Sequence, residues 1–410
     1  MPTPHTPAAL NPDSRLTLVF LAALVALGPL SVDMYLPAMP TMQRALGTDI
    51  VQMHLTLSAY LWGFAIFHLA CGPLADRFGR RPILLLGTLL FISASLGCAT
   101  ATDVETLTIC RFVQGIGACV GPTLARTITR DIFGPRRAAQ ALSLLAMIMA
   151  LAPAVAPGLG GIMLRYVEWP AVFYFLAIYG MAMLAIVFRF LPETLPEPQS
   201  LRPARIAGNY LLLLRDPLFL PVALASASVY SGLLAYLACS GFVFINMLGV
   251  PVEYFGLIFL SSVIGYISGS ALSARLAVRQ DPIYVMVGGV CLALGATLIM
   301  LVLHLANPDS IMAIVIPMTF YAAALGLVMP HAQALAMAHH PLIAATTSAL
   351  FGFLQMALSA VITAGVGSVL NNSPLPMIAT MTALTGTALV LVLISRKQER
   401  LMRDHQSSEV

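Results

Sequence analysis

The chain has 410 residues, of which 59% are hydrophobic and only 9% are charged, and its mean hydropathy is +0.90. This composition excludes a water-soluble globular protein and is typical of a chain that crosses a bilayer many times. The formal net charge of +4 is modest, and its distribution along the chain points to membrane topology rather than to a nucleic-acid partner.

Twelve apolar segments are long enough to be membrane helices, because a spanning helix needs about 20 predominantly apolar residues. No segment requires a β-strand, so the predicted fold class is an all-α integral membrane protein. The first segment is too long for a signal-peptide core and lacks a small-residue cleavage site, so we expect it to remain as a helix. The predicted spans are residues 16–38, 52–74, 83–102, 105–126, 139–164, 170–191, 218–243, 253–277, 284–305, 310–332, 343–369 and 374–395.

One long polar interruption near the middle of the chain leaves six predicted spans on each side. It is rich in proline, glutamate and arginine, which is typical of a linker between two membrane bundles. The predicted organisation is a tail at 1–15, a six-helix bundle at 16–191, a central linker at 192–217, a second six-helix bundle at 218–395 and a tail at 396–410.

Basic residues predict the orientation of the chain in the membrane. Of the 21 Lys and Arg residues, eighteen fall in the two tails, the central linker and the loops on their side of the membrane. Only Arg44 and Arg165 fall on the other side, and Arg111 lies inside the fourth span. The positive-inside rule therefore predicts that both termini are cytoplasmic.

Asp33 is the one acidic residue that lies inside a predicted span rather than in a loop, a tail or at a span end. An aspartate at the centre of a membrane helix costs about 2.5–3.5 kcal/mol on insertion scales. It could cap or pack the partly hydrated outer end of the helix, or it could face a water-filled cavity and bind a proton. We favour the second interpretation because intramembrane acids usually mark ion pathways.

The sequence around this acid, residues 31–40 with the letters SVDMYLPAMP, resembles the helix-1 signature of drug:proton antiporters of the major facilitator superfamily. The form is similar to that of the Bcr/CflA branch, whose members export bicyclomycin, chloramphenicol-type and other drugs. The resemblance implies the MFS fold, in which two pseudo-symmetric six-helix bundles bind substrate between them.

A cluster of charges separates the second and third spans at residues 72–82, GPLADRFGRRP. It resembles the superfamily signature G-x-L-a-D-R-x-G-R-R, whose charges latch the cytoplasmic side in relatives. The alternative is ordinary cytoplasmic surface charge. The residues that the resemblance implies as a gate are Gly72, Asp76, Arg77, Gly79, Arg80 and Arg81, with Arg130 and Asp131 beyond the fourth span.

Arg111 is the second charged residue inside a predicted span. It shares one helical face with Gln114, Gly115 and Ala118, and this pattern resembles the superfamily motif whose arginine is associated with proton transfer. Because a guanidinium does not lose its proton in proteins, Arg111 is expected to bias the charge of Asp33 rather than to carry a proton. The alternative is an arginine that extends to the nearby membrane surface.

The fifth span contains residues 152–161, APAVAPGLGG, which resemble the antiporter motif g-x-x-x-G-P-x-x-G-G. The matching positions are Ala156, Pro157, Gly160 and Gly161, and alanine replaces the first two motif glycines at Ala152 and Ala156. Uptake members of the superfamily usually lack this motif, so the resemblance favours export. Small residues at this spacing are also common in ordinary helix packing.

Substrate contacts are expected from aromatic and amide side chains in the spans, because a mostly apolar pocket with a few polar groups suits varied drugs. Each of these residues could instead be an ordinary packing side chain. The candidates are Tyr35, Tyr60, Gln114, Tyr230, Tyr236, Phe351 and Gln355.

These patterns together predict proton-coupled efflux of small amphipathic drugs, neutral to zwitterionic, from the bacterial cytoplasmic membrane. An exporter of an amino acid or another metabolite is the alternative, and a proton symporter fits less well. The sequence contains no catalytic motif and no metal-like cysteine spacing, so neither an enzyme nor a cofactor is predicted. The expected partners are the drug, protons and the lipid bilayer, and no nucleic acid is expected. The protein is expected to function as a monomer.

Overall fold

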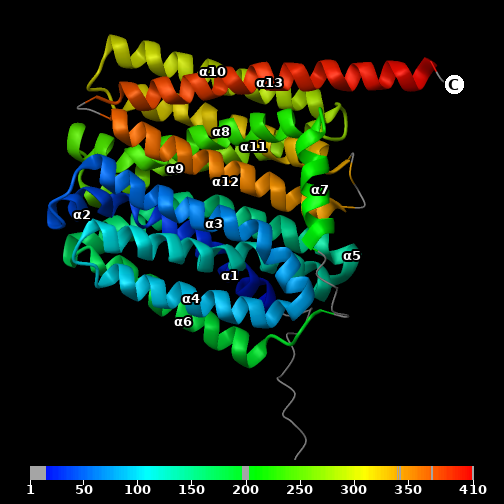
Figure 1. Ribbon diagram of the computed structural model, residues 1–410. Coiled ribbons are helices and arrows are strands. Elements are labelled where there is room, and N and C mark those ends of the chain that lie inside the picture. Colours follow the sequence, from blue (N-terminus) through cyan, green and yellow to red (C-terminus); the bar gives the residue numbers. More distant parts are fainter. Residues whose placement is uncertain (1–14, 196–202, 339, 341–342, 371–372, 409–410) are drawn as a thin grey trace, which may run out of the picture.

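The computed structural model describes residues 15–195, 203–338, 340, 343–370 and 373–408. Every regular element in these ranges is helical, which confirms the all-α fold class (Figure 1). The elements are α1 (Arg15–Asp33), η1 (Leu36–Ala38), α2 (Met39–Ala45), α3 (Ile50–Phe78), α4 (Arg80–Ala99), α5 (Val104–Tyr166), α6 (Pro170–Phe190), α7 (Pro203–Arg215), α8 (Phe219–Ser240), η2 (Gly241–Met247), η3 (Val252–Tyr254), α9 (Phe255–Leu276), α10 (Pro282–Ala306), α11 (Met312–Ala338), α12 (Ala344–Val369) and α13 (Leu375–Ser408).

Eleven helical segments among the described residues are long and apolar enough to cross a membrane, and they correspond to eleven of the predicted spans. The remaining predicted span, 139–164, falls within α5. The side chains of residues 134–154 lie outside the part of the chain that the structure describes.

Helix α5 is a single helical stretch of 63 residues, which is longer than one membrane pass requires. If it were straight it would be about 95 Å long, roughly three times the thickness of a hydrocarbon core. Both of its ends nevertheless lie against the same end of α1. Arg111 donates a hydrogen bond to the carbonyl of Ser31, and Gly160 lies against the carbonyl of Met34. The path of α5 therefore reverses between these positions.

The helices pack in two groups that lie side by side (Figure 1). In the first group α1, α3 and α4 contact α5, and α6 contacts α4. In the second group α11 contacts α8, α9 and α10, while α13 contacts α8 and α10, and α12 contacts α8. The groups meet where α3 packs on α12 and α5 packs on α9. Of the eleven candidate membrane segments in the described residues, five lie in the first group and six in the second.

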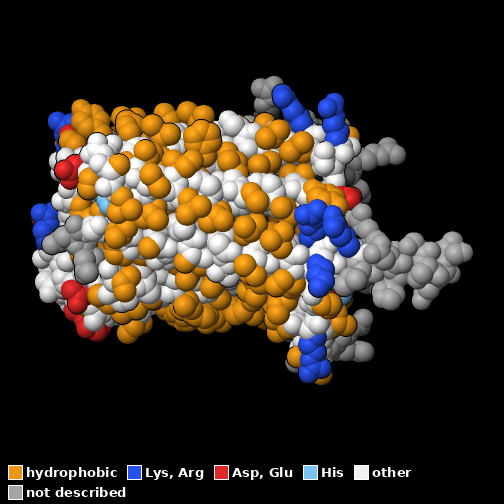
Figure 2. Space-filling view, turned by 90° about the horizontal axis from the view of Figure 1, so that it is seen from above, with side chains coloured by type: hydrophobic (Ala, Val, Ile, Leu, Met, Phe, Trp, Pro, Cys, Tyr) orange, Lys and Arg blue, Asp and Glu red, His pale blue; other side chains and the backbone are white. Residues whose placement is uncertain are grey.

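The surface is divided along the direction of the helices. An apolar band covers the middle of the face shown in Figure 2, and Lys and Arg side chains gather mainly at one end. This is the end that carries α7 in Figure 1, and we refer to it as the α7 end. The opposite end carries α2 and is called the α2 end.

The predicted linker at 192–217 contains a helix that the hydropathy pattern does not predict. Helix α7 lies across the end of the bundles instead of running parallel to the spans (Figure 1). Its Tyr210 hydroxyl donates a hydrogen bond of 3.1 Å to the carbonyl of Leu69 on α3, which ties the linker to the first bundle. Helix α13 likewise continues beyond the predicted span end at residue 395 and reaches Ser408.

Candidate functional site

Asp33 is the last residue of α1, and after a short irregularity at Met34 and Tyr35 the chain continues helically through η1 and α2. The structure therefore places this carboxylate within the first candidate membrane span, Thr17–Ala45. Only 4% of its surface is exposed, and it forms no ion pair within 4.0 Å to any described residue. Asp33 is therefore a buried acid without a paired cation, an arrangement that costs free energy when the acid is charged.

The second bundle approaches this acid through Tyr230 on α8. Tyr230 lies within electrostatic range of both Asp33 and Arg126, and Arg126 is within the same range of Tyr266 on α9. The side chain of Arg126 is exposed. Arg126 thus lies on the side of α5 that faces α8 and α9 of the second bundle.

Arg111 is completely buried and lies between two aromatic rings. The centre of its guanidinium is 4.3 Å from the ring centroid of Tyr35 and 4.4 Å from that of Tyr60. Its Nη1 donates hydrogen bonds to the carbonyl of Ser31 at 3.1 Å and to Oε1 of Gln114 at 2.6 Å. Cation–π contacts of this kind are strongest where water is excluded. The side chain does not extend to the membrane surface, and no direct ion pair joins it to Asp33.

The groups around Arg111 are held by their own hydrogen bonds. The Tyr60 hydroxyl donates to the carbonyl of Gly28 at 3.2 Å, and the Tyr35 hydroxyl bonds to the hydroxyl of Thr56. Gln114 Nε2 donates to the hydroxyl of Ser95 at 2.8 Å. Nε and Nη2 of Arg111 have no hydrogen-bond partner among the described residues. Hydrogen bonds thus hold the aromatic cage formed by Tyr35 and Tyr60, while two guanidinium nitrogens could still donate to a water molecule or a ligand.

Close contact between α3 and α5 makes this cage possible. A Cβ atom placed on Gly115 would lie 2.0 Å from the carbonyl oxygen of Tyr60, and one on Gly63 would lie 2.0 Å from the carbonyl oxygen of Phe112. Neither position can hold a larger residue without moving a backbone. Small residues at facing positions are the usual means of bringing membrane helices this close.

The predicted substrate residues do not all lie together. Tyr35, Tyr60 and Gln114 surround Arg111 at the level of Asp33. Tyr236 instead packs inside the second bundle, with its ring centroid 5.7 Å from that of Phe259.

Two further candidates lie on α12. Gln355 donates a hydrogen bond of 3.0 Å to the hydroxyl of Ser226, within the second bundle, and Phe351 is buried. Tyr230 is the residue of this set that lies half-buried on α8 near Asp33.

The residues of the predicted antiporter motif lie between α1 and the second bundle. A Cβ on Gly160 would be 2.6 Å from the carbonyl oxygen of Met34, next to Asp33. A Cβ on Gly161 would be 2.2 Å from the carbonyl oxygen of Val252 in η3. Ala156 is fully buried and Pro157 is buried beside it. This part of α5 therefore contacts both bundles at the α2 end.

The predicted gate residues lie at the α7 end, where α3 and α4 are separated by the single residue Gly79. Gly79 has a φ of +100°, which favours glycine, and its N–H bonds to the carbonyl of Ala75. Gly72 lies inside α3, and a Cβ atom placed on it would meet nothing within 4 Å, so the turn does not require glycine at this position. The chain therefore turns from α3 to α4 at Gly79, within one residue, whereas the predicted spans left residues 75–82 between the two helices.

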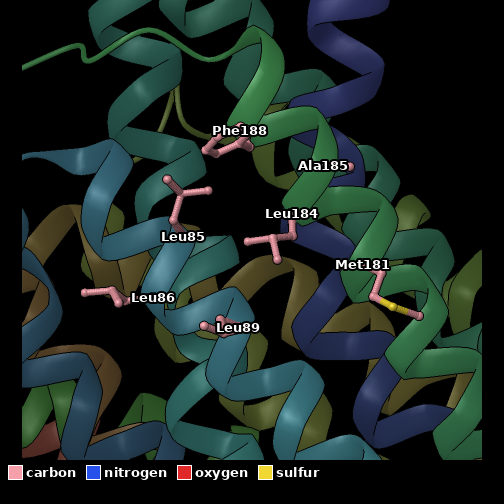
Figure 3. Close-up of a pocket in the computed structure, with 7 residues that line it drawn as sticks. All are labelled: Leu85, Leu86, Leu89, Met181, Leu184, Ala185 and Phe188. Carbon is pink, nitrogen blue, oxygen red and sulfur yellow. The ribbon is translucent and has the colours of Figure 1, made fainter.

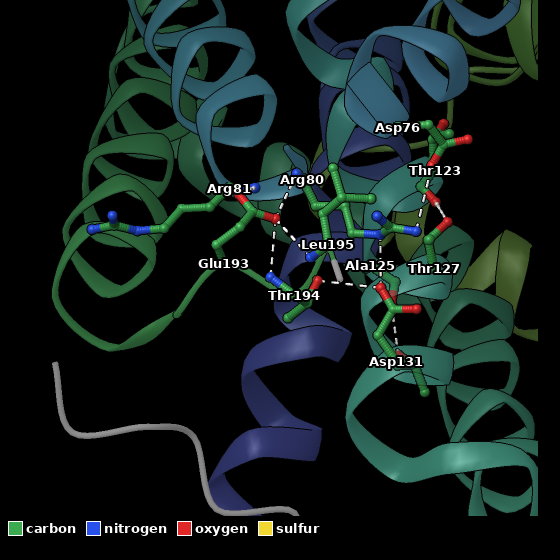
Figure 4. Close-up of polar contacts among 11 residues, drawn as sticks. Asp76, Arg80, Arg81, Thr123, Ala125, Thr127, Asp131, Glu193, Thr194 and Leu195 are labelled. Carbon is green, nitrogen blue, oxygen red and sulfur yellow. Dashed lines mark hydrogen bonds and ion pairs between the residues drawn. The ribbon is translucent and has the colours of Figure 1, made fainter. Parts of the chain in front are cut away.

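Arg80 is the centre of the charged contacts at this turn. Its Nε lies 2.7 Å from Oδ2 of Asp131 on α5, and its Nη2 lies 3.4 Å from Oδ1 of Asp76 (Figure 4). Arg77 is exposed, and the side chain of Arg130 lies outside the described residues. The structure thus joins α3, α4 and α5 through one largely buried arginine.

Glu193 completes this cluster and was missed by the sequence reasoning. Its carboxylate accepts the backbone N–H groups of Arg80 at 2.9 Å and Arg81 at 3.2 Å, so it caps the N-terminus of α4 (Figure 4). A Cβ on Gly79 would lie 2.4 Å from Oε2 of Glu193, which is a second reason for glycine there. The signal in the sequence is an acidic residue just after the sixth span, on the same side of the membrane as the charged turn.

Comparison with known proteins agrees with this architecture. The family model of the Major Facilitator Superfamily matches residues 20–364. Uncharacterized MFS-type transporter YdgK of Bacillus subtilis is 33% identical, covering 93% of this chain and 96% of the relative. Bicyclomycin resistance protein homolog of Haemophilus influenzae is 30% identical, covering 90% of this chain and 94% of the relative.

Solved structures show the same fold. The crystal structure of a bacterial homolog of the human lysosomal transporter Spinster, in an inward-facing and occupied conformation, has a TM-score of 0.73 at 16% identity. The match covers 96% of this chain and 98% of the other. The chain belongs to the Major Facilitator Superfamily of membrane transporters.

Proposed function

We propose that the protein is a proton-coupled exporter of small amphipathic drugs, of neutral to zwitterionic character. It acts as a monomer in the bacterial cytoplasmic membrane with both termini in the cytoplasm, so that the α7 end faces the cytoplasm. Asp33 binds the proton, and Arg111 influences the electrostatics of the site. The observation that carries this proposal is the buried, unpaired carboxylate of Asp33 at the junction of α1 with Tyr230 of the second bundle.

Coupling follows from the different surroundings that Asp33 has in the two access states. A carboxylate binds protons more tightly when it is desolvated than when water surrounds it. If the acid is hydrated in one state and buried in the other, its proton affinity differs between them. A drug that prefers the deprotonated state then exchanges for a proton, because coupling between two ligands is reciprocal.

Arg111 adds a fixed positive charge near this acid without neutralising it directly. It binds the carbonyl of Ser31, two residues before Asp33, and its guanidinium lies against the ring of Tyr35. A small shift of α1 against α5 would change the distance between the two charges. In a medium of low dielectric constant such a change has a large electrostatic effect.

Two features support export of drugs in particular. The residues that resemble the antiporter motif lie against Met34 and Val252, where they contact α1 and the second bundle. The Haemophilus influenzae relative that covers most of this chain is named for bicyclomycin resistance. Bicyclomycin-like and chloramphenicol-like compounds are therefore the first substrates to test.

Reconstituted vesicles with an imposed pH gradient test the coupling. Asp33→Asn should reduce proton-driven drug efflux more than tenfold, because the amide cannot release a proton. Asp103→Asn is the matched control. Asp103 is an exposed N-cap of α5 whose Oδ1 accepts the N–H of Thr106 at 2.7 Å, and asparagine caps helices equally well. Undiminished proton-driven efflux by Asp33→Asn would refute the role of Asp33.

A drug panel in a host that lacks its own pumps tests the cargo. Wild type should confer resistance to at least one compound, and Asp33→Asn should lose it. Proton-driven transport without resistance to any drug would instead favour export of an amino acid or another metabolite.

A further inference from the structure

A shallow apolar recess lies between α4 and α6, on the outside of the first bundle and away from the contact between the bundles (Figures 1 and 3). Its volume is about 440 Å³. It is lined by Leu85, Leu86 and Leu89 of α4 and by Met181, Leu184 and Phe188 of α6. The recess therefore faces the lipid rather than the transport pathway.

The length of the recess along α6 fits within one leaflet of the bilayer. Its residue nearest the α7 end is Phe188, close to the end of α6 at Phe190. Met181, at the other end, lies about 10 Å further along the helix axis at 1.5 Å per residue. Half of a hydrocarbon core of about 30 Å is about 15 Å, so the recess lies within one leaflet. The part of an acyl chain that is nearest the headgroup, in the leaflet at the α7 end, would thus lie along the recess.

Positive charge lies at the end of this recess that is nearest the α7 end. The guanidinium of Arg81 is 5.7 Å from the ring centroid of Phe188, and its Nη2 donates a hydrogen bond of 2.7 Å to the Phe188 carbonyl. Arg189 follows Phe188 directly in the sequence, and its guanidinium is 5.5 Å from the ring of Phe190. Neither arginine forms an ion pair within 4.0 Å to an acid in the described part of the chain.

The acidic side chains near Arg81 and Arg189 already bind other groups. Glu193 accepts the backbone N–H groups of Arg80 and Arg81, so its carboxylate is directed at the N-terminus of α4. Asp131 pairs with Arg80 at 2.7 Å. The positive charge of Arg81 and Arg189 therefore remains at the level where lipid phosphates lie.

We propose that this recess binds an anionic phospholipid of the leaflet at the α7 end. One acyl chain lies along α4 and α6, and the phosphate accepts hydrogen bonds from Arg81 and Arg189. Basic pockets between membrane helices are known sites for anionic headgroups, and guanidinium groups match phosphate geometry. A zwitterionic lipid fits the apolar recess equally well but carries an ammonium group that opposes the arginines. This site is independent of the cargo and of proton coupling.

Native mass spectrometry of the full-length protein tests the charge preference. The delipidated protein is mixed with phosphatidylglycerol or phosphatidylcholine that have identical acyl chains. Wild type should retain phosphatidylglycerol at least fivefold better, and Arg81→Gln should lower that preference about fivefold, since each basic residue near the surface contributes about a factor of five. Arg279→Gln, which removes an exposed charge beyond α9 in the second bundle, should leave it unchanged.

A second pair of variants tests the recess without touching the gate. Leu89→Trp fills the recess and should lower phosphatidylglycerol retention several-fold. Leu96→Trp places the same side chain on α4 at an exposed position outside the recess and should have no effect. Equal retention of the two lipids by wild type, or equal effects of the two tryptophans, would overturn the proposal. So would the detection of a second copy of the chain in place of lipid.

Discussion

The contact between α3 and α5 leads to a prediction about Gly115. The substitution Gly115→Ala adds one methyl group that would lie 2.0 Å from the carbonyl oxygen of Tyr60. Ordinary contacts of this kind lie at 3.4–4 Å. The two helices must therefore separate by about 1.4 Å, because neither backbone can yield locally without strain.

This separation would loosen the cage around Arg111. The guanidinium is now 4.4 Å from the ring centroid of Tyr60, and the shift would bring it close to the limit of about 6 Å for a cation–π contact. Overpacking of this kind lowers the free energy of unfolding by about 1–3 kcal/mol. A misplacement of about 1 Å in a functional site costs up to about 100-fold in rate. We therefore expect drug efflux to fall at least about tenfold.

Thermal unfolding in detergent and drug efflux from vesicles would be measured for this variant and for Gly295→Ala. A Cβ on Gly295 meets nothing within 4 Å, so this control should be neutral, or stabilising by up to about 1 kcal/mol, since alanine is the better helix former. If Gly115→Ala were as stable and as active as Gly295→Ala, the close contact of α3 with α5 would not support the site.

Three further predictions concern the α7 end. Arg80→Gln and Asp131→Asn should each lower the free energy of unfolding by about 1–3 kcal/mol, and the double variant should lose less than the sum, which thermal unfolding of the four proteins would show. Glu193→Ala should cost about 0.5–2 kcal/mol because two N–H groups of α4 lose their acceptor, whereas Glu193→Gln should retain much of the stability; equal losses would contradict the capping role. Partial burial of Asp216 tends to raise its pKa, but hydrogen bonds from His340 and from two backbone N–H groups outweigh this and hold the pKa below its ordinary value. The contribution of Asp216 is therefore present above pH about 4 and is lost as the pH falls through the lowered pKa, so Asp216→Asn should flatten the acid limb of the stability profile.

Hydropathy predicted the helices well because apolar length is a local property. The predicted spans and the described helices agree in number and order, apart from the stretch inside α5 whose side chains are not described. The ends of the helices were less predictable from the sequence. The first span continues to Ala45 and α3 continues to Phe78, beyond the predicted ends at residues 38 and 74.

The candidate site was predicted in part. Arg111 and Gln114 share a face of one helix, so their proximity follows from the period of 3.6 residues. Their contacts with Tyr35 and Tyr60 involve two other helices and could not be read from any single segment. Tyr236 was chosen for its residue type alone, and it packs within the second bundle instead.

Glu193 and Arg126 were missed for the same reason. Each is an ordinary charged residue near a predicted span end, and nothing beside it in the sequence indicates a partner. Glu193 gains its role because α4 begins next to the end of α6, and Arg126 because α8 and α9 approach α5. Such pairings depend on how helices are arranged across the whole bundle.

The sequence by itself determined that the chain is a membrane transporter with one acid and one arginine inside its spans, because burial of charge in a bilayer is costly enough to mark those positions. Only the tertiary structure decided that Asp33 has no ion pair with any described residue, that Arg111 is held between two tyrosines, and that Gly115 and Gly63 permit this contact. The physical reason is the distance along the chain over which each kind of information acts. Hydropathy and helical periodicity act over a few turns of one helix, whereas the site is formed where backbones far apart in the sequence approach within contact distance.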